Sequence, residues 1–288
     1  MNAVVLGEAV QGYSHIRKEV ECQDSMKKVI CEDGTIIMAV ADGHGSTSCP
    51  YSKTGSSVAV NVFCSVMQQL LDGYSDQLDM LLTYLNREGD TKVAQAIDTE
   101  WKKRILKLHS KYKREIPLLE NGEKDKLSVY KQYGSTLIGL MITREFLFAF
   151  QLGDGDIAYV DDSGVDLIIS PEKILGVETH SMSREDAWKK ALSTVRRVDS
   201  DKLSSSMFSL SSDGFSNSHK NEAEFEKTLS EYFLMIKEHS PSVIDANLKS
   251  WLKETSEYGC GDDITLLMAY FPEPAAEVSS DREVTVDE

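Results

Sequence analysis

One local pattern occurs four times in this 288-residue chain: an apolar segment ends, and an Asp-Gly or Asp-Asp pair follows it. The pairs are Asp42-Gly43, Asp154-Gly155, Asp213-Gly214 and Asp262-Asp263. One such pair is typical of a hairpin turn. Several carboxylates held at strand ends can instead gather at one site, where they repel one another unless a hard divalent cation neutralises them. The pattern therefore predicts either separate turns or an acidic metal site.

The apolar segments and the stretches between them predict an α+β fold. The predicted strands are Thr35–Ala41, Ser135–Ile142, Phe146–Leu152, Ile157–Val160, Asp166–Ile169, Met207–Leu210 and Ile264–Phe271. Helical spacing of apolar residues predicts helices over Ser52–Leu71, Val93–Ile116, Arg184–Thr194, Glu222–Lys237 and Ile244–Thr255. Strands in hairpins alternate with long helices, which favours antiparallel sheets covered by helices. The polar stretch Pro117–Lys131 is predicted to be a loop.

The net charge of −16 limits the classes of partner. A nucleic-acid binder needs a basic face, and so does a protein that binds an anionic membrane surface, so we expect neither partner. A phosphorylated substrate stays compatible with this charge, because bound cations reverse the sign of a local acidic site.

Cysteine content and the N-terminal segment predict a cytoplasmic protein. The five cysteines are an odd number and form no C-x-x-C pair. The segment that begins MNAVVLGEAV has no basic stretch followed by an apolar run, and no apolar run approaches the ~20 residues of a membrane span. We expect one catalytic domain over residues 1–272 and an acidic, disordered tail over residues 273–288.

Six ordered segments resemble the type 2C (PPM-type) metal-dependent protein serine/threonine phosphatases. They are Gln23-Asp24-Ser25, Asp42-Gly43-His44-Gly45, Gly134-Ser135-Thr136, Gly153-Asp154-Gly155-Asp156, Ser212-Asp213-Gly214 and Gly261-Asp262-Asp263-Ile264-Thr265. They occur in the order typical of the family and cover residues 23 to 265. The resemblance implies a four-layer α/β/β/α sandwich of two antiparallel sheets flanked by helices, with metals at one end.

The resemblance also implies which residues bind the metals, two Mn²⁺ or Mg²⁺ ions and a weaker third. Asp42 matches the aspartate that bridges both ions, and Gly43 matches a ligand through its backbone carbonyl. Asp213 and Asp262 match the other carboxylates of the pair, and Asp154 matches a ligand of the third ion. Three further residues are expected beside the ligands rather than on the ions: Asp24, Gln23 and Asp263.

His44 matches the general acid that protonates the leaving alkoxide, and a histidine that titrates near neutrality suits that task. The alternative is a histidine that only hydrogen-bonds a turn or a metal-bound water. By the same resemblance a hydroxide that bridges the metals attacks phosphorus in line, without a phospho-enzyme intermediate. His44 and Asp42 are thus the expected catalytic residues.

The contact with the substrate phosphate departs from the family pattern. Many relatives have an arginine at the position of Glu19. His15 or Arg17 is the expected replacement, unless both are simply solvated. Further along the chain, the basic pair Arg196 and Arg197 could contact a phosphopeptide or form a solvated end of the predicted helix.

The leading hypothesis is a monomeric Mg²⁺/Mn²⁺-dependent hydrolase of phosphoserine and phosphothreonine in phosphorylated proteins. One alternative is a pseudophosphatase that keeps the fold and only binds a partner. Another is a phosphatase of small phosphoesters, since specificity depends on loops and not on metal ligands.

Overall fold

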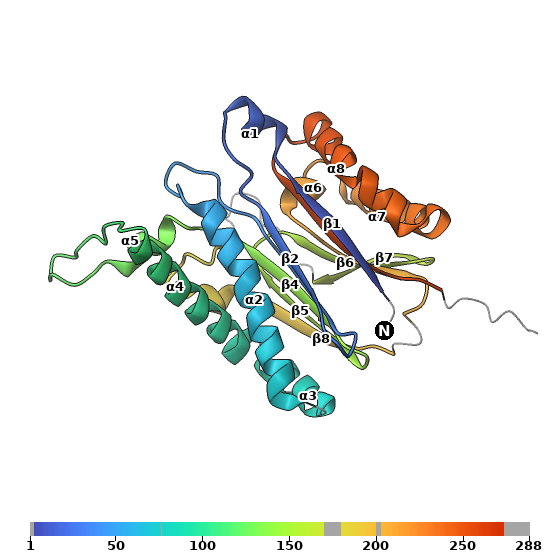
Figure 1. Ribbon diagram of the computed structural model, residues 1–288, viewed down its shortest axis with the longest axis horizontal. Coiled ribbons are helices and arrows are strands. Elements are labelled where there is room, and N and C mark those ends of the chain that lie inside the picture. The colour runs from blue at the N-terminus through green and yellow to red at the C-terminus, as the bar shows by residue number, and fades with distance from the viewer. Residues whose placement is uncertain (1–2, 76, 170–179, 200–202, 274–288) are drawn as a thin grey trace, which may run out of the picture.

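The computed structural model describes residues 3–75, 77–169, 180–199 and 203–273. In this part of the chain, two five-stranded antiparallel sheets face each other (Figure 1). The first has the order β1-β10-β9-β6-β7, with bounds Val4–Val10, Ile264–Phe271, Ser206–Ser211, Asp156–Asp161 and Gly164–Ile169. The second has the order β2-β3-β4-β5-β8, with bounds Ser25–Ile30, Ile36–Ala41, Leu137–Ile142, Phe146–Leu152 and Leu192–Arg197.

Helices cover the outer face of each sheet, as Figure 1 shows. On the second sheet lie α2 (Ser52–Tyr74), α3 (Leu78–Glu88), the π-helix η1 (Gly89–Val93), α4 (Ala94–Lys111) and α5 (Lys126–Lys131). On the first lie α7 (Glu222–His239) and α8 (Pro241–Tyr258). The short elements α1 (Tyr13–Arg17), η2 (Ala187–Lys190) and α6 (Asp213–Ser216) connect strands and helices. The predicted four-layer sandwich is confirmed.

Three apolar clusters fill the spaces between the four layers. In β3, Ile37 and Ala39 face the cluster under α2 and α4, while Ile36 and Met38 face the cluster between the sheets. Both faces of β3 are therefore buried, which explains its unbroken apolar sequence. A third cluster joins the first sheet to α7 and α8.

The predicted helix over Arg184–Thr194 is wrong. Only Ala187–Lys190 is helical, as one 3-10 turn, and Leu192–Arg197 is the edge strand β8. Every residue of β8 pairs with β5, from Gln151↔Leu192 to Phe146↔Arg197. Strand pairing thus overrides a helix-compatible spacing of apolar residues, because the sheet supplies hydrogen bonds that a short isolated helix cannot replace.

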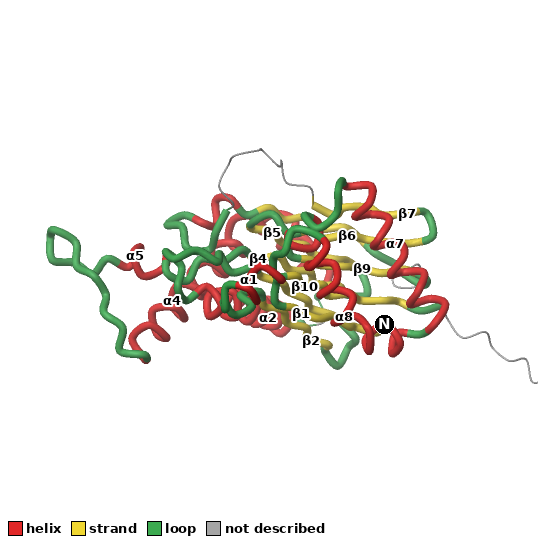
Figure 2. The backbone as a smooth tube through the Cα atoms, turned by 90° about the horizontal axis from the view of Figure 1, so that it is seen from above, coloured by secondary structure: helices red, strands yellow, loops and turns green. Residues whose placement is uncertain are grey.

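Several boundaries also differ from the prediction. The helix predicted to end at Ile116 ends at Lys111, and the predicted loop Pro117–Lys131 contains α5. Between these two helices, residues 112–125 form an arm that stands away from the body (Figure 2). Apart from Glu273, the predicted tail lies outside the described residues, and so do residues 170–179 between β7 and β8. No helix in the described ranges has both the length and the apolar character of a membrane span.

Candidate metal centre

Asp42 follows directly after β3, and two hydrogen bonds fix its backbone. Its N–H donates to Thr136 Oγ1 at 2.9 Å, and the N–H of Thr136 donates to the Asp42 carbonyl at 2.8 Å. The neighbouring Gly43 bridges to Ser135. A Cβ on Gly43 would lie 2.7 Å from the backbone oxygen of Gln23, so only glycine fits there. The Gly-Ser-Thr segment before β4 therefore sets where Asp42 stands.

The other predicted ligands lie at strand ends on the same side of the sandwich. Asp213 begins α6 after β9, Asp262 precedes β10, and Asp154 lies in the turn between β5 and β6. Gly214 has to be glycine because a Cβ there would lie 2.0 Å from the backbone oxygen of Asp263. Because neighbouring strands are antiparallel, these strand ends and the Asp42 end of β3 meet at one edge.

The carboxylates are close enough to change one another's acidity. Burial, followed by the charges of Asp24, Asp213 and Asp262, raises the pKa of Asp42 well above its ordinary value. Burial and the nearby charge of Asp154 raise the pKa of Asp213 to about 6. The structure thus brings these five aspartates together, although 238 residues separate Asp24 from Asp262 (262 − 24).

Asp24 is the most deeply buried of this set, with 1% of its surface exposed. Its Oδ2 accepts hydrogen bonds from Ser212 Oγ at 2.7 Å and from Thr265 Oγ1 at 2.8 Å. Its Oδ1 is buried and, among the described residues, has no N–H or hydroxyl donor. Burial raises the pKa of Asp24 to about 7, although both hydroxyl donors act to lower it. The unpaired oxygen marks a place where water or a cation would be stabilised.

Asp263 holds the loop around the ligands. Its Oδ1 accepts from the Gly12 N–H at 2.6 Å and lies 2.9 Å from His15 Nδ1, while its Oδ2 accepts from the Gln23 N–H at 2.6 Å. These contacts occupy three of the about four lone-pair directions of the carboxylate, which favours the expected place of Asp263 beside the ligands. Gln23 Oε1 is buried and accepts no hydrogen bond from the described residues.

The two candidates for the phosphate contact lie in different surroundings. His15 is bound to Asp263, its side chain is 14% exposed, and its Nε2 lies 3.7 Å from Asp262 Oδ1. Arg17 is exposed on α1. Of the two, only His15 is in contact with the acidic centre in the described contacts.

His44 is held by the segment that precedes β4. Its N–H donates to the Gly134 carbonyl at 3.1 Å. A Cβ on Gly134 would lie 2.7 Å from His44 Cδ2, so the imidazole rests against the Gly134 backbone. His44 is two residues from Asp42, and both residues are hydrogen-bonded to the same Gly-Ser-Thr segment.

The donor set fits hard divalent cations. All the gathered side-chain donors are oxygens, the preferred ligands of Mg²⁺ and Mn²⁺. Over the described ranges, no three acidic, histidine or cysteine side chains already surround one point as a complete ligand set. Mg²⁺ characteristically binds through one or two carboxylates and keeps several waters. Burial first and neighbouring carboxylates second raise the pKa values of Asp24, Asp42 and Asp213, and a bound cation would oppose both effects.

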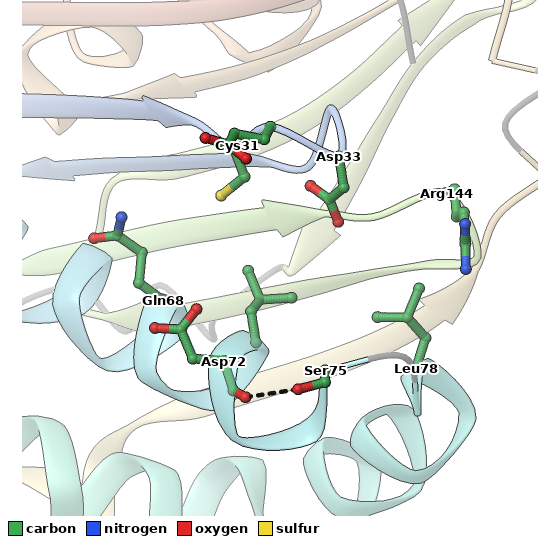
Figure 3. A pocket seen from close by; sticks show the side chains of 9 residues that line it. Cys31, Asp33, Gln68, Asp72, Ser75, Leu78 and Arg144 are labelled. Carbon is green, nitrogen blue, oxygen red and sulfur yellow. Dashed lines mark hydrogen bonds between the residues drawn. The ribbon is translucent and has the colours of Figure 1, made fainter.

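A cavity of about 520 Å³ lies away from this centre, at the other end of β3 (Figure 3). It is lined by Cys31, Asp33, Asp72 and Arg144, among others. The basic pair lies toward that end too. Arg197 is paired with Asp79 at 2.9 Å, and Arg196 forms an ion pair with Asp166. These arginines therefore form exposed ion pairs with other parts of the sandwich and do not face the acidic centre.

The sequence interpretation missed the residues that hold the aspartates, among them Ser212, Thr265 and Thr136. It also gave no role to Asp156, which is 6% exposed and whose charge contributes to the raised pKa of Asp213. Each of these residues belongs to one of the six ordered segments. The signal was therefore present, but only the fold reveals which carboxylate each hydroxyl contacts.

The chain matches a family model described as protein phosphatase 2C over residues 11–253. Its fold is similar to that of the Mycobacterium tuberculosis serine/threonine phosphatase PstP/Ppp, at 14% identity and a TM-score of 0.57, covering 95% of this chain and 100% of that chain. It is also similar to the S. agalactiae serine/threonine phosphatase, at 13% identity and a TM-score of 0.58, covering 94% of this chain and 100% of that chain.

The catalytic domain of PstP in complex with two manganese ions is similar as well, at 16% identity and a TM-score of 0.57, covering 94% of this chain and 99% of that chain. No curated protein gives a significant sequence match. The structural likenesses establish the fold, and the family model covers most of the chain. The chain belongs to the protein phosphatase 2C family of metal-dependent protein phosphatases.

Proposed function

We propose that this protein hydrolyses phosphoserine and phosphothreonine in phosphorylated proteins with two Mg²⁺ or Mn²⁺ ions, and that a weaker third ion binds beside them. The observation that carries the proposal is the meeting of Asp42, Asp213 and Asp262 at one end of the sandwich. A protein that kept the fold only to bind a partner would have no need for these mutually repelling carboxylates.

Each of the site residues named above has a defined task in this proposal. Asp42, Asp213, Asp262 and the Gly43 carbonyl would hold the ion pair, and Asp154 would help to hold the third ion. When bound, the ions supply a nucleophile by lowering the pKa of water, and they neutralise charge on the phosphoryl group. Asp24, Gln23 and Asp263 orient the ligands, and His44 gives a proton to the leaving serine or threonine oxygen.

The reaction should depend strictly on divalent cations. We expect turnover of p-nitrophenyl phosphate and of phosphopeptides with added Mn²⁺ or Mg²⁺, and loss of turnover in EDTA that returns when Mn²⁺ is restored. Initial rates across a metal titration provide the measurement. A rate that EDTA leaves unchanged contradicts the proposal, and binding of Mn²⁺ without turnover points to a pseudophosphatase.

His15, rather than Arg17, should contact the substrate phosphate, because His15 faces Asp262 while Arg17 is exposed on α1. Loss of a hydrogen bond to a charged group costs about 1.5–3 kcal/mol. We therefore expect His15→Ala to lower kcat/KM for a phosphopeptide by about 10- to 100-fold. Arg17→Ala is the matched control and should change it less than about twofold. The reverse order of effects would assign the contact to Arg17.

We further propose that the protein acts as a monomer in the cytoplasm, without nucleic acid or membrane as a partner. The net charge of −16 supports the exclusion of both polyanionic partners. The substrate class is tested by comparing phosphopeptides with small phosphoesters, since a clear preference for the latter would favour a phosphatase of small molecules.

A further inference from the structure

A buried polar cluster lies behind the acidic centre and has no part in the function proposed above. Its middle is the hydroxyl of Tyr133, whose side chain is fully buried. Arg114 Nη1 donates to this hydroxyl at 2.6 Å, and His109 Nδ1 lies 3.2 Å from it. The Arg114 guanidinium also lies 3.3 Å from the ring centre of Tyr51. Two of the three members, Tyr133 and His109, are at most 1% exposed.

With a neutral His109 ring, the donors and acceptors of this cluster allow only one arrangement of the protons. His109 Nε2 lies 2.9 Å from the Glu115 carbonyl, which can only accept, so Nε2 carries the proton. In the neutral ring, Nδ1 then accepts from the Tyr133 hydroxyl, which in turn accepts from Arg114. Tyr133 is thus fixed both by its packing and by one donor and one acceptor at its hydroxyl.

This fixed side chain is joined to His44 through a single residue. Tyr133 is followed by Gly134, whose carbonyl accepts the His44 N–H at 3.1 Å. The His44 ring rests against Gly134, because a Cβ placed on that glycine would lie only 2.7 Å from His44 Cδ2. The backbone of Tyr133 also packs closely against α2. Its carbonyl oxygen lies so near Gly55 that a Cβ on that glycine would be only 1.8 Å away. A shift of Tyr133 is therefore transmitted to the surface on which His44 rests.

We propose that Tyr133, fixed by Arg114 and His109, is a positioning residue that aligns His44 for proton donation to the leaving oxygen. The inference rests on the proposed function and adds to it the part of the fold that sets the angle of the acid. Loss of the Tyr133 hydroxyl leaves the backbone hydrogen bonds between Thr136 and Asp42 in place. Its effect should therefore be confined to substrates whose leaving group needs a proton.

Tyr133→Phe tests this with the removal of one oxygen atom. For a phosphoserine peptide, whose leaving alkoxide needs a proton, we expect kcat to fall about tenfold with KM unchanged. For p-nitrophenyl phosphate, whose phenolate leaves without protonation, we expect kcat to change less than about twofold. A purely structural defect would lower both rates in proportion. Arg114→Leu removes the hydrogen-bond donor to the Tyr133 hydroxyl and leaves Tyr133 itself unchanged. It should show the same selective loss.

Tyr130→Phe is the matched control, because Tyr130 lies one turn away and packs against Trp101. It should leave both rates unchanged. A double-mutant cycle with His44→Ala identifies the route: in the His44→Ala background, Tyr133→Phe should have no further effect on the phosphopeptide rate.

The outcomes separate this inference from the function on which it rests. A wild-type protein without metal-dependent turnover overturns both. An active wild type with a selective loss in His44→Ala, but no loss in Tyr133→Phe, overturns the positioning role alone. Equal losses of Tyr133→Phe on both substrates, or a full effect in the His44→Ala background, overturn it as well.

Discussion

Asp213→Asn should remove nearly all turnover of p-nitrophenyl phosphate while the protein stays folded. The change deletes one negative charge from the proposed ligand set and keeps the shape of the side chain. Asn217 Nδ2, which donates to Asp213 Oδ2 at 3.0 Å, can still donate to the amide oxygen. Electrostatic stabilisation of the transition state usually supplies most of the rate acceleration of an enzyme. The loss in kcat should therefore reach about 10³-fold or more.

Thermal unfolding gives a second readout of the same variant. The pKa of Asp213 is raised to about 6 in the folded protein, so its ionisation is resisted there and costs stability as the pH rises through that value. At pH 7 without metal, Asp213→Asn should therefore unfold at the same temperature as the wild type or higher. Added Mn²⁺ should stabilise the wild type and have little effect on the variant.

Asp162→Asn is the matched control, because Asp162 is exposed, pairs with Lys237 and lies in the β6–β7 turn, far from the ligand set. Its activity and its response to Mn²⁺ should equal those of the wild type. An Asp213→Asn protein with full activity would remove Asp213 from the metal site.

Two glycine substitutions in α2 should change stability in opposite directions. A Cβ on Gly55 would lie 1.8 Å from the Tyr133 backbone oxygen, so the backbone of α2 or of the Tyr133 segment would have to move. Overpacking of a core commonly costs about 1–3 kcal/mol, and a clash with backbone belongs at the upper end, so Gly55→Ala should cost about 3 kcal/mol or more. Activity should fall too, because Tyr133 leads into the Gly-Ser-Thr segment that holds Asp42.

Gly73 lies in the same helix, and no atom comes within 4 Å of a Cβ placed there. Gly73→Ala should therefore stabilise the protein by about 0.5 kcal/mol, since alanine loses less backbone entropy in a helix. Urea unfolding of both variants measures the two effects. Similar stabilities for the two variants would contradict the close contact between α2 and Tyr133.

The sequence could predict Asp42, Asp154 and Asp213 because each follows a strongly apolar strand, and both features are local. Asp262 departs from that pattern, because it precedes β10 and follows α8. It could not predict β8, because Leu192–Arg197 is a strand only through its pairing with β5. It also gave no sign of β1, whose Gly7 and Glu8 interrupt the apolar pattern and whose strand is stabilised by pairing with β10. The contacts of Asp263 with Gly12, His15 and Gln23 are equally non-local. What depends on distant pairing was thus hidden. Two local elements, the helices α3 and α5, were missed as well.

The pairing of β1 with β10 has a consequence during synthesis. Among the described residues, the first strand pairs with the last, from Val4↔Tyr270 to Val10↔Ile264, and Asp262 lies two residues before that last strand. A ribosome releases Asp42 more than 200 residues before Asp262 (262 − 42 = 220). Until β10 emerges, the first sheet lacks the strand between β1 and β9. The acidic centre also lacks Asp262 until shortly before that strand emerges. With the proposed ligand set, the nascent chain could therefore hold no complete pair of cations before Asp262 and β10 have emerged.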